Sequence, residues 1–196
     1  YDIFRDDISC VLGKRVPKVP FPEGIILTKA IQPMEGEVER NIKRGYQRLI
    51  GSLLWYVRHI SPIAAYGCSQ LCKLMATPTD TAWECALHML TYLHAERHHG
   101  LIISETDEPP TMYVDASNRD DPHDGKCQYG YCIMWGGPLI AKSGKLNHVG
   151  MNSTYNEYMA LTHAIKQLVW LRQLMHETGM SAHISSPTIV YADNKQ

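Results

Sequence analysis

Apolar residues recur at helical spacing through the first half of the chain. Three amphipathic helices are expected between about residue 42 and Gly100. The first runs through NIKRGYQRLIGSLLWYVRHI, and the next two begin at the Ser-Pro pair 61–62 and the Thr-Pro pair 77–78, where a capping residue precedes proline. Residues 1–41 mix proline and glycine with isolated apolar side chains, which predicts an extended linker. Residues 42–108 are expected to form a helical connection region.

The pattern becomes strand-like after the polar segment SETDEPP. Three short apolar runs, TMYVDAS, CQYGYCIMW and LIAKS, are separated by short links and predict an antiparallel meander. A long helix from Thr154 to about Thr178 and a final strand, TIVYAD, follow. The predicted fold is α/β (α+β), with the order strand-strand-strand-helix-strand in residues 109–196. The crossover helix allows the last strand to lie parallel to the first.

The first and last of these strands each end on an aspartate, Asp115 and Asp193. If the two strands are parallel neighbours, both carboxylates lie at the carboxyl edge of the sheet. Glu157 lies in the first turn of the long helix, in line with its predicted apolar face, and is expected to point towards the sheet. That face comprises Leu161, Ala164, Ile165, Leu168, Leu171 and Met175.

Each of the three acids also has an ordinary structural interpretation. A lone aspartate after a strand is commonly a turn former, and Glu157 could complete a capping box with Thr154 as the N-cap. Three converging carboxylates, however, would repel one another unless a cation lay between them. Oxygen ligands of this kind suit Mg²⁺, and a pair of such ions can support phosphodiester hydrolysis.

Composition narrows the class of protein only slightly. The 196 residues carry a net charge of −1, so the molecule as a whole has no positive potential of the kind that favours nucleic-acid binding. A local cationic patch is still compatible with this net charge. Apolar stretches fall short of the roughly 20 residues that span a bilayer, and the N-terminus lacks signal-peptide character. The six cysteines show no CxxC or zinc-like spacing, which suits a reducing compartment. We expect no membrane contact and no secretion.

Three blocks stand out in the second half of the chain: YVDAS, STYNEYMALTHAIKQLVWLRQLMHETG and VYADNKQ. They resemble blocks of the ribonuclease H domain in the Pol polyproteins of copia-type (pseudovirus) LTR retrotransposons. The long block is similar to that domain's S-T-x-A-E-Y-x-A-L … A-x-x-E-x-x-W-L-R-x-L-L-x-E-L-G stretch. Upstream, the stretch from YQRLIGSLLWYVRHI to HMLTYLHAERHHGL is similar to the helical region that links reverse transcriptase to ribonuclease H. The resemblance is collinear over nearly the whole chain.

This resemblance implies the C-terminal part of a reverse transcriptase followed by a ribonuclease H domain, truncated at both ends. It implies divalent-metal-dependent hydrolysis of the RNA strand of RNA-DNA hybrids. The catalytic residues, and the ligands of two Mg²⁺ ions that Mn²⁺ could replace, would be Asp115, Glu157 and Asp193. The family's fourth acidic ligand would follow Gln196 and its polymerase motif would precede Tyr1. The 196-residue piece alone is therefore expected to have little nuclease activity.

The same resemblance implies partners and a location. The RNA-DNA hybrid is the expected substrate, and the reverse transcriptase and integrase parts of Pol are the expected protein partners. The location would be the cytoplasm, within virus-like particles, or the nucleus. Departures from the family pattern, such as DASN in place of DADW, leave an alternative open: a catalytically silent connection or nucleic-acid-binding remnant of a decayed retroelement.

Polar side chains near the three acids could donate hydrogen bonds to phosphates or 2′-hydroxyls, although solvated loop polarity is the more common explanation for any one of them. These candidates are Ser117, Asn118, Ser153, Asn156 and Asn194. His148, in the segment before the long helix, is a candidate proton shuttle.

A cationic cluster near the first helix could track a duplex backbone or could simply be a solvated helix face. It consists of Arg40, Lys43, Arg44 and Arg48, of which Arg44 and Arg48 are the candidate substrate contacts. All four tryptophans fall on apolar faces and are predicted to be core residues. They are Trp55, Trp83, Trp135 and Trp170.

Overall fold

A computed structural model describes residues 16–29, 32–117, 121 and 123–193. The chain divides into two compact units, Tyr1–Gly100 and Leu101–Gln196. The division falls earlier than the boundary expected after residue 108, because the segment before the first strand is tied to the sheet. The backbone N–H of Ser104 donates to the carbonyl oxygen of Gly136 over 2.8 Å.

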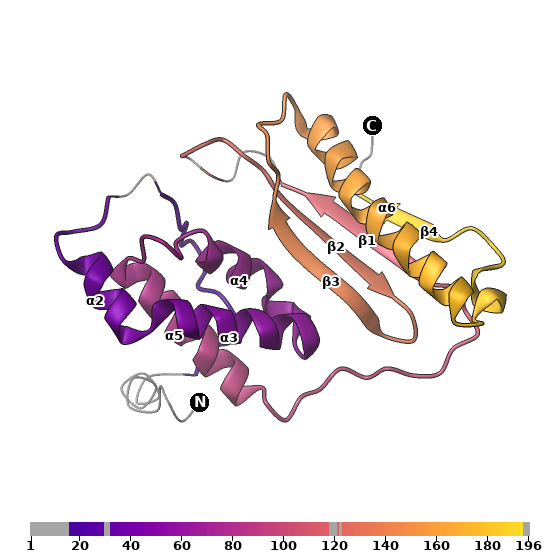
Figure 1. The fold of residues 1–196 in the computed structure, drawn as a ribbon, viewed down its shortest axis with the longest axis horizontal. Coiled ribbons are helices and arrows are strands. Elements are labelled where there is room, and N and C mark those ends of the chain that lie inside the picture. Colours follow the sequence, from indigo (N-terminus) through magenta and orange to yellow (C-terminus); the bar gives the residue numbers. More distant parts are fainter. Residues whose placement is uncertain (1–15, 30–31, 118–120, 122, 194–196) are drawn as a thin grey trace. The chain divides into compact units, whose positions relative to one another are not determined.

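The N-terminal unit is helical (Figure 1). Its elements are α2 (Glu37–Arg44), α3 (Tyr46–His59), the 3-10 turn η2 (Pro62–Ala64), α4 (Ala65–Cys72) and α5 (Asp80–Ala95). Thr79 caps α5 by accepting a hydrogen bond from the backbone N–H of Ala82. Gly45, with a φ of 93°, separates α2 from α3, so the single expected first helix is two helices.

Helix α2 begins at Glu37, inside the region predicted to be an extended linker. That prediction was wrong at its C-terminal end because polar contacts, rather than an apolar stripe, hold this helix. Glu37 accepts hydrogen bonds from the backbone N–H groups of Met34 and Asp80. Asn41 is fully buried and donates to the carboxylate of Asp80 at 3.0 Å. Hydrophobic periodicity cannot detect such an anchor.

The C-terminal unit contains a four-stranded mixed sheet in the order β3-β2-β1-β4. Its elements are β1 (Thr111–Ala116), β2 (Gln128–Met134), β3 (Pro138–Lys145), α6 (Ser153–Glu177), the 3-10 turn η3 (Ser181–Ile184) and β4 (Ile189–Ala192). The first three strands are antiparallel, and β4 pairs parallel to β1. The α/β fold class is confirmed, with the strand-strand-strand-helix-strand order predicted for a ribonuclease H-like sheet.

Helix α6 lies along one face of this sheet and packs on β1 and β2 (Figure 1). The buried side chains of α6 recur every three or four residues, as a helix on a sheet requires. They are Ala160, Ala164, Leu168, Leu171 and Met175, and they meet Met112, Val114, Tyr129, Tyr131 and Ile133 from the strands. Ile165 was predicted to belong to this face but is 41% exposed, because it is one position off the buried row.

The tryptophan predictions are correct only in part. Trp83 is 5% exposed and belongs to the core of the N-terminal unit. Trp55 and Trp170, in contrast, are 59% and 51% exposed, so the core prediction was wrong for both. In the described parts of the chain, no helix combines the length and apolarity needed to cross a bilayer.

Candidate functional site

The carboxyl edge of the sheet brings two of the predicted acids together. The parallel register pairs Val114 with Ala192, so the next residue of each strand is an aspartate, Asp115 opposite Asp193. Both side chains are exposed. The crossover through α6 places these two residues, which are far apart in the sequence, at one edge of the sheet.

Glu157 enters the site from α6. The N-cap of this helix is Asn152, whose side chain accepts a hydrogen bond from the backbone N–H of Tyr155 at 2.7 Å. Because Ser153 is already helical, Thr154 is not the N-cap, and the proposed capping box of Thr154 with Glu157 does not form. The capping-box explanation for Glu157 is therefore excluded.

The carboxylate of Glu157 has one satisfied and one unsatisfied oxygen. The backbone N–H of Ala116, at the end of β1, donates a hydrogen bond to this carboxylate. Oε2 is buried and has no hydrogen-bond partner within the described residues. A buried, unpaired carboxylate oxygen is costly, since it has lost water without gaining a donor. A cation is the natural partner for such an atom.

Electrostatics link the three acids. Burial raises the pKa of Glu157 above its ordinary value, and the negative charge of Asp115 raises it further. The hydrogen bond from Ala116 lowers the pKa, and the more weakly coupled charge of Asp193 raises it. Both aspartates therefore lie near enough to Glu157 at this edge for their charges to disfavour its ionisation.

The side chains do not, however, form a closed ligand shell. Within the ranges that the structure describes, no three acidic, histidine or cysteine side chains are grouped closely enough to hold a metal ion. The unsatisfied oxygen of Glu157 fits a cation, and Asp115 and Asp193 are both exposed. Metal binding by Asp115, Glu157 and Asp193 stays a prediction.

The predicted substrate-contact residues lie in different environments. Ser117 bridges β1 and β2, because its hydroxyl donates to the carbonyl of Gln128 and accepts from the backbone N–H of the same residue. Ser153 is exposed in the first turn of α6. Asn156 is fully buried, so its side chain faces the protein interior and is not open to a substrate. Asn118 and Asn194 lie outside the described residues.

Two residues that sequence reasoning missed shape the first turn of α6. Asn152 supplies the cap, and its signal was an Asx residue just before the helix. A Cβ atom on Gly150 would lie 1.6 Å from Oδ1 of Asn156, so only glycine allows this approach. His148 packs edge-on against Tyr155, with ring centres 5.6 Å apart, and its role as a proton shuttle stays a prediction.

The cationic candidates belong to the N-terminal unit. Arg40 and Arg44 both pair with Asp80, and the guanidinium of Arg44 lies 5.9 Å from the centre of the Trp83 ring. These contacts give Arg44 a structural role between α2 and α5. Arg48 is exposed on α3 and is the better candidate for contact with a partner.

Replacing Glu157 with glutamine is expected to stabilise the metal-free protein at neutral pH. The raised pKa means that the folded state holds this proton more tightly than the unfolded state, so stability falls as pH rises from the ordinary value of 4.5 through the folded pKa. We expect Glu157→Gln to raise the melting temperature by about 1–3 °C at neutral pH and to have little effect below the ordinary pKa.

Thermal denaturation followed across pH provides the measurement. Glu105→Gln is the matched control, because Glu105 is an exposed glutamate of the same unit. A gain for Glu157→Gln that is equal at all pH values, or equal to that of the control, would contradict the electrostatic account.

No protein-family model and no solved structure matches the chain. It is 29% identical over 151 residues, 76% of this chain, to the retrovirus-related Pol polyprotein from transposon RE2 of Arabidopsis thaliana. It is 26% identical over 178 residues, 90% of this chain, to the retrovirus-related Pol polyprotein from transposon TNT 1-94 of Nicotiana tabacum. A secreted RxLR effector protein 161 of Plasmopara viticola is 27% identical over 128 residues, 64% of this chain and 90% of the effector.

The first two relatives confirm the predicted resemblance. The mixed sheet with acids at its carboxyl edge occurs in a chain that is similar to retrovirus-related Pol polyproteins over most of its length. The similarity is to the Pol polyproteins of copia-type transposons. The matches span only 10% and 13% of the lengths of these two polyproteins.

Proposed function

We propose that this chain is part of the Pol polyprotein of a copia-type retrotransposon and that its C-terminal unit hydrolyses the RNA strand of RNA-DNA hybrids during reverse transcription. The observation that carries the proposal is the buried, unsatisfied Oε2 of Glu157, next to the charge of Asp115 at the edge where β4 ends on Asp193. The relationship to Pol polyproteins supports it independently.

The residues have separate tasks in this proposal. Asp115 and Asp193 would extend exposed carboxylates from neighbouring strands towards divalent ions, two Mg²⁺ or Mn²⁺. Ala116 would orient Glu157 by holding one of its oxygens, which leaves Oε2 for the same ions. Bound Mg²⁺ would supply the Lewis acidity that phosphodiester hydrolysis requires. Ser153, exposed beside Glu157, could donate to a phosphate or 2′-hydroxyl of the hybrid.

Mg²⁺-dependent cleavage of the RNA strand of a hybrid, by the polyprotein that carries this chain, is the test of this function. Retained hybrid binding without cleavage would instead indicate the alternative, a catalytically silent nucleic-acid-holding module. Cleavage that survives neutralisation of the three acids would place the chemistry elsewhere.

An exposed face of α3 supports a role in holding nucleic acid. We define the α3 surface as Arg48, Trp55, Arg58 and His59, all of which are exposed. The ring of Trp55 lies 4.9 Å from that of His59, tilted by 30°. Cations beside an exposed aromatic ring suit phosphates and the faces of bases or sugars. We propose that this surface contacts the hybrid.

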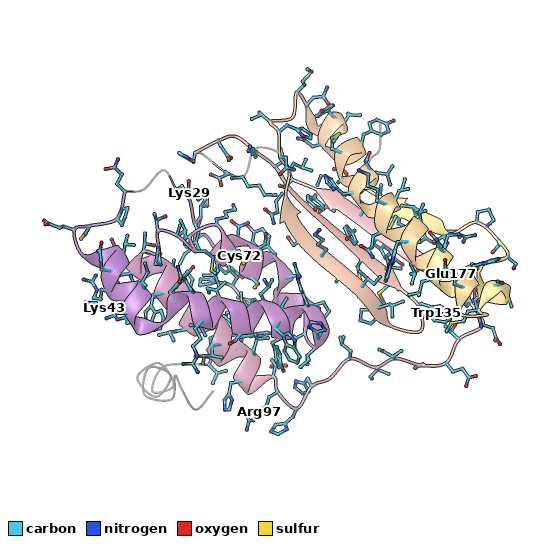
Figure 2. All side chains as sticks on the ribbon, viewed as in Figure 1. Lys29, Lys43, Cys72, Arg97, Trp135 and Glu177 are labelled. Atoms are coloured by element: carbon cyan, nitrogen blue, oxygen red, sulfur yellow. The ribbon has the colours of Figure 1, made fainter. Side chains whose placement is uncertain are left out.

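Replacing Arg48 with glutamine is expected to weaken hybrid binding by about three- to tenfold at low salt and to reduce its salt dependence, because one phosphate contact is lost. Fluorescence anisotropy with a labelled hybrid at several salt concentrations measures both effects. Lys29→Gln is the control, since it removes an exposed cation that lies outside the α3 surface (Figure 2). Equal losses in the two variants would show that only overall charge matters.

A further inference from the structure

A pocket of about 300 Å³ lies at the amino end of β1, opposite to the edge that carries Asp115. The register pairs Thr111 with Met134, so Trp135, the next residue, stands at this end of the sheet (Figure 2). The pocket is bounded by the extended segment 103–107, which we call the strap, and by Trp135 and His183. All of these residues belong to the C-terminal unit.

The strap is fixed to the sheet by close backbone approach. A Cβ atom on Gly136, which has a φ of 65°, would lie 1.9 Å from the carbonyl oxygen of Ser104. A Cβ on Gly137 would lie 2.3 Å from the carbonyl oxygen of Ile102. The two glycines thus let the strap and the preceding residue, Ile102, pack directly on the turn between β2 and β3. Just after the strap, the carbonyl oxygen of Glu108 accepts a hydrogen bond from the indole N–H of Trp135 at 3.2 Å. This bond ties the C-terminal end of the strap to the sheet.

The lining of the pocket combines aromatic surface with negative charge. The rings of Trp135 and His183 meet edge to face at 5.4 Å between centres. Glu105 and Asp107 are exposed on the strap, and among the described residues no lysine or arginine forms an ion pair with either. A tryptophan with two adjacent carboxylates attracts a cation, through the ring face and through ordinary charge pairing.

We propose that this pocket binds an arginine side chain of a basic peptide segment of a partner protein. The planar guanidinium can stack on an indole and can pair with a carboxylate at the same time, which an ammonium ion does less well. The pocket volume of about 300 Å³ is ample for one such side chain. Phosphate is disfavoured by the two carboxylates, so this site is not an extension of the proposed hybrid surface.

The proposal is tested with the full chain and an acetylated hexa-arginine peptide. The probe signal is the Trp135 indole N–H resonance, assigned by comparison with Trp135→Phe. We expect a saturable shift of this resonance with hexa-arginine and none with hexa-citrulline, which keeps the shape but removes the charge. In Glu105→Gln/Asp107→Asn, binding should weaken by about fivefold or more, as the loss of two exposed ion pairs implies.

Controls separate this site from general charge effects. Glu23→Gln/Glu35→Gln removes the same charge from two exposed residues of the N-terminal unit, and it should leave the shift unchanged. An unmoved Trp135 resonance, an equal response to hexa-citrulline, or equal weakening in the two double variants would overturn the proposal. Hybrid cleavage is expected to survive in the strap variant, so failure here leaves the proposed ribonuclease function untouched.

Discussion

Changing any one of the three edge acids to its amide is expected to lower Mg²⁺-dependent hybrid cleavage by on the order of a hundredfold or more in a Pol polyprotein that carries this chain. The variants are Asp115→Asn, Glu157→Gln and Asp193→Asn. Each keeps the shape of the side chain and removes one negative charge, so the loss reports on charge at the carboxyl edge. Product analysis of an end-labelled RNA strand measures the rate.

The matched control is Asp107→Asn, which neutralises an exposed aspartate of the strap at the opposite end of the sheet. This variant should cleave at nearly the wild-type rate. Comparable rates for all four variants and the wild type would contradict the assignment of the three acids. Non-additive losses on combining the edge variants would further indicate that the acids act as one unit.

Removing a large side chain from the buried row of α6 is expected to have the greatest effect on stability. Leu168 is 6% exposed and packs against the sheet, so Leu168→Ala should lower the free energy of unfolding of the C-terminal unit by about 2–4 kcal/mol. Ile165→Ala removes a side chain of the same size from the exposed flank of the helix. It should cost well below about 1 kcal/mol.

Urea denaturation followed by circular dichroism compares these two variants. The contrast matters for function because α6 carries Glu157, and a loosened helix would also displace this carboxylate. Similar losses of stability for Leu168→Ala and Ile165→Ala would contradict the packing of α6 on the sheet. They would also support the wider apolar face expected from the sequence.

The sheet was predictable because strands and helices leave strong periodic signals. Three short apolar runs, a long amphipathic helix and a final run are enough to order the elements, and the chirality of crossover connections then places β4 beside β1. Helix α2 was missed because it is held by polar contacts: Glu37 accepts a hydrogen bond from the backbone N–H of Met34, and Asn41 donates one to Asp80. The exposed positions of Trp55 and Trp170 were missed because residue type indicates burial less reliably than position on a helix.

The candidate site was predictable to a different degree at each residue. Asp115 and Asp193 could be placed at one edge because each ends an apolar run and the topology allows the two strands to be parallel, whereas their register is known only from the structure. The inward position of Glu157 followed from helical spacing, but its buried Oε2 and its hydrogen bond from Ala116 depend on tertiary packing. The burial of Asn156 could not be predicted either. It depends on the close approach of Gly150, which leaves no signal in the sequence around Asn156.

The central claim is that Asp115, Glu157 and Asp193 together bind a divalent ion, and paramagnetic NMR tests it most directly. Substoichiometric Mn²⁺ is added to the ¹⁵N-labelled chain, and loss of amide signals locates the ion. We predict early broadening at residues 114–116, 153–158 and 192–193, its reversal by excess Mg²⁺, and its loss in Glu157→Gln but not in Asp107→Asn. Broadening that is unchanged in Glu157→Gln, or that begins at the strap, would contradict the account.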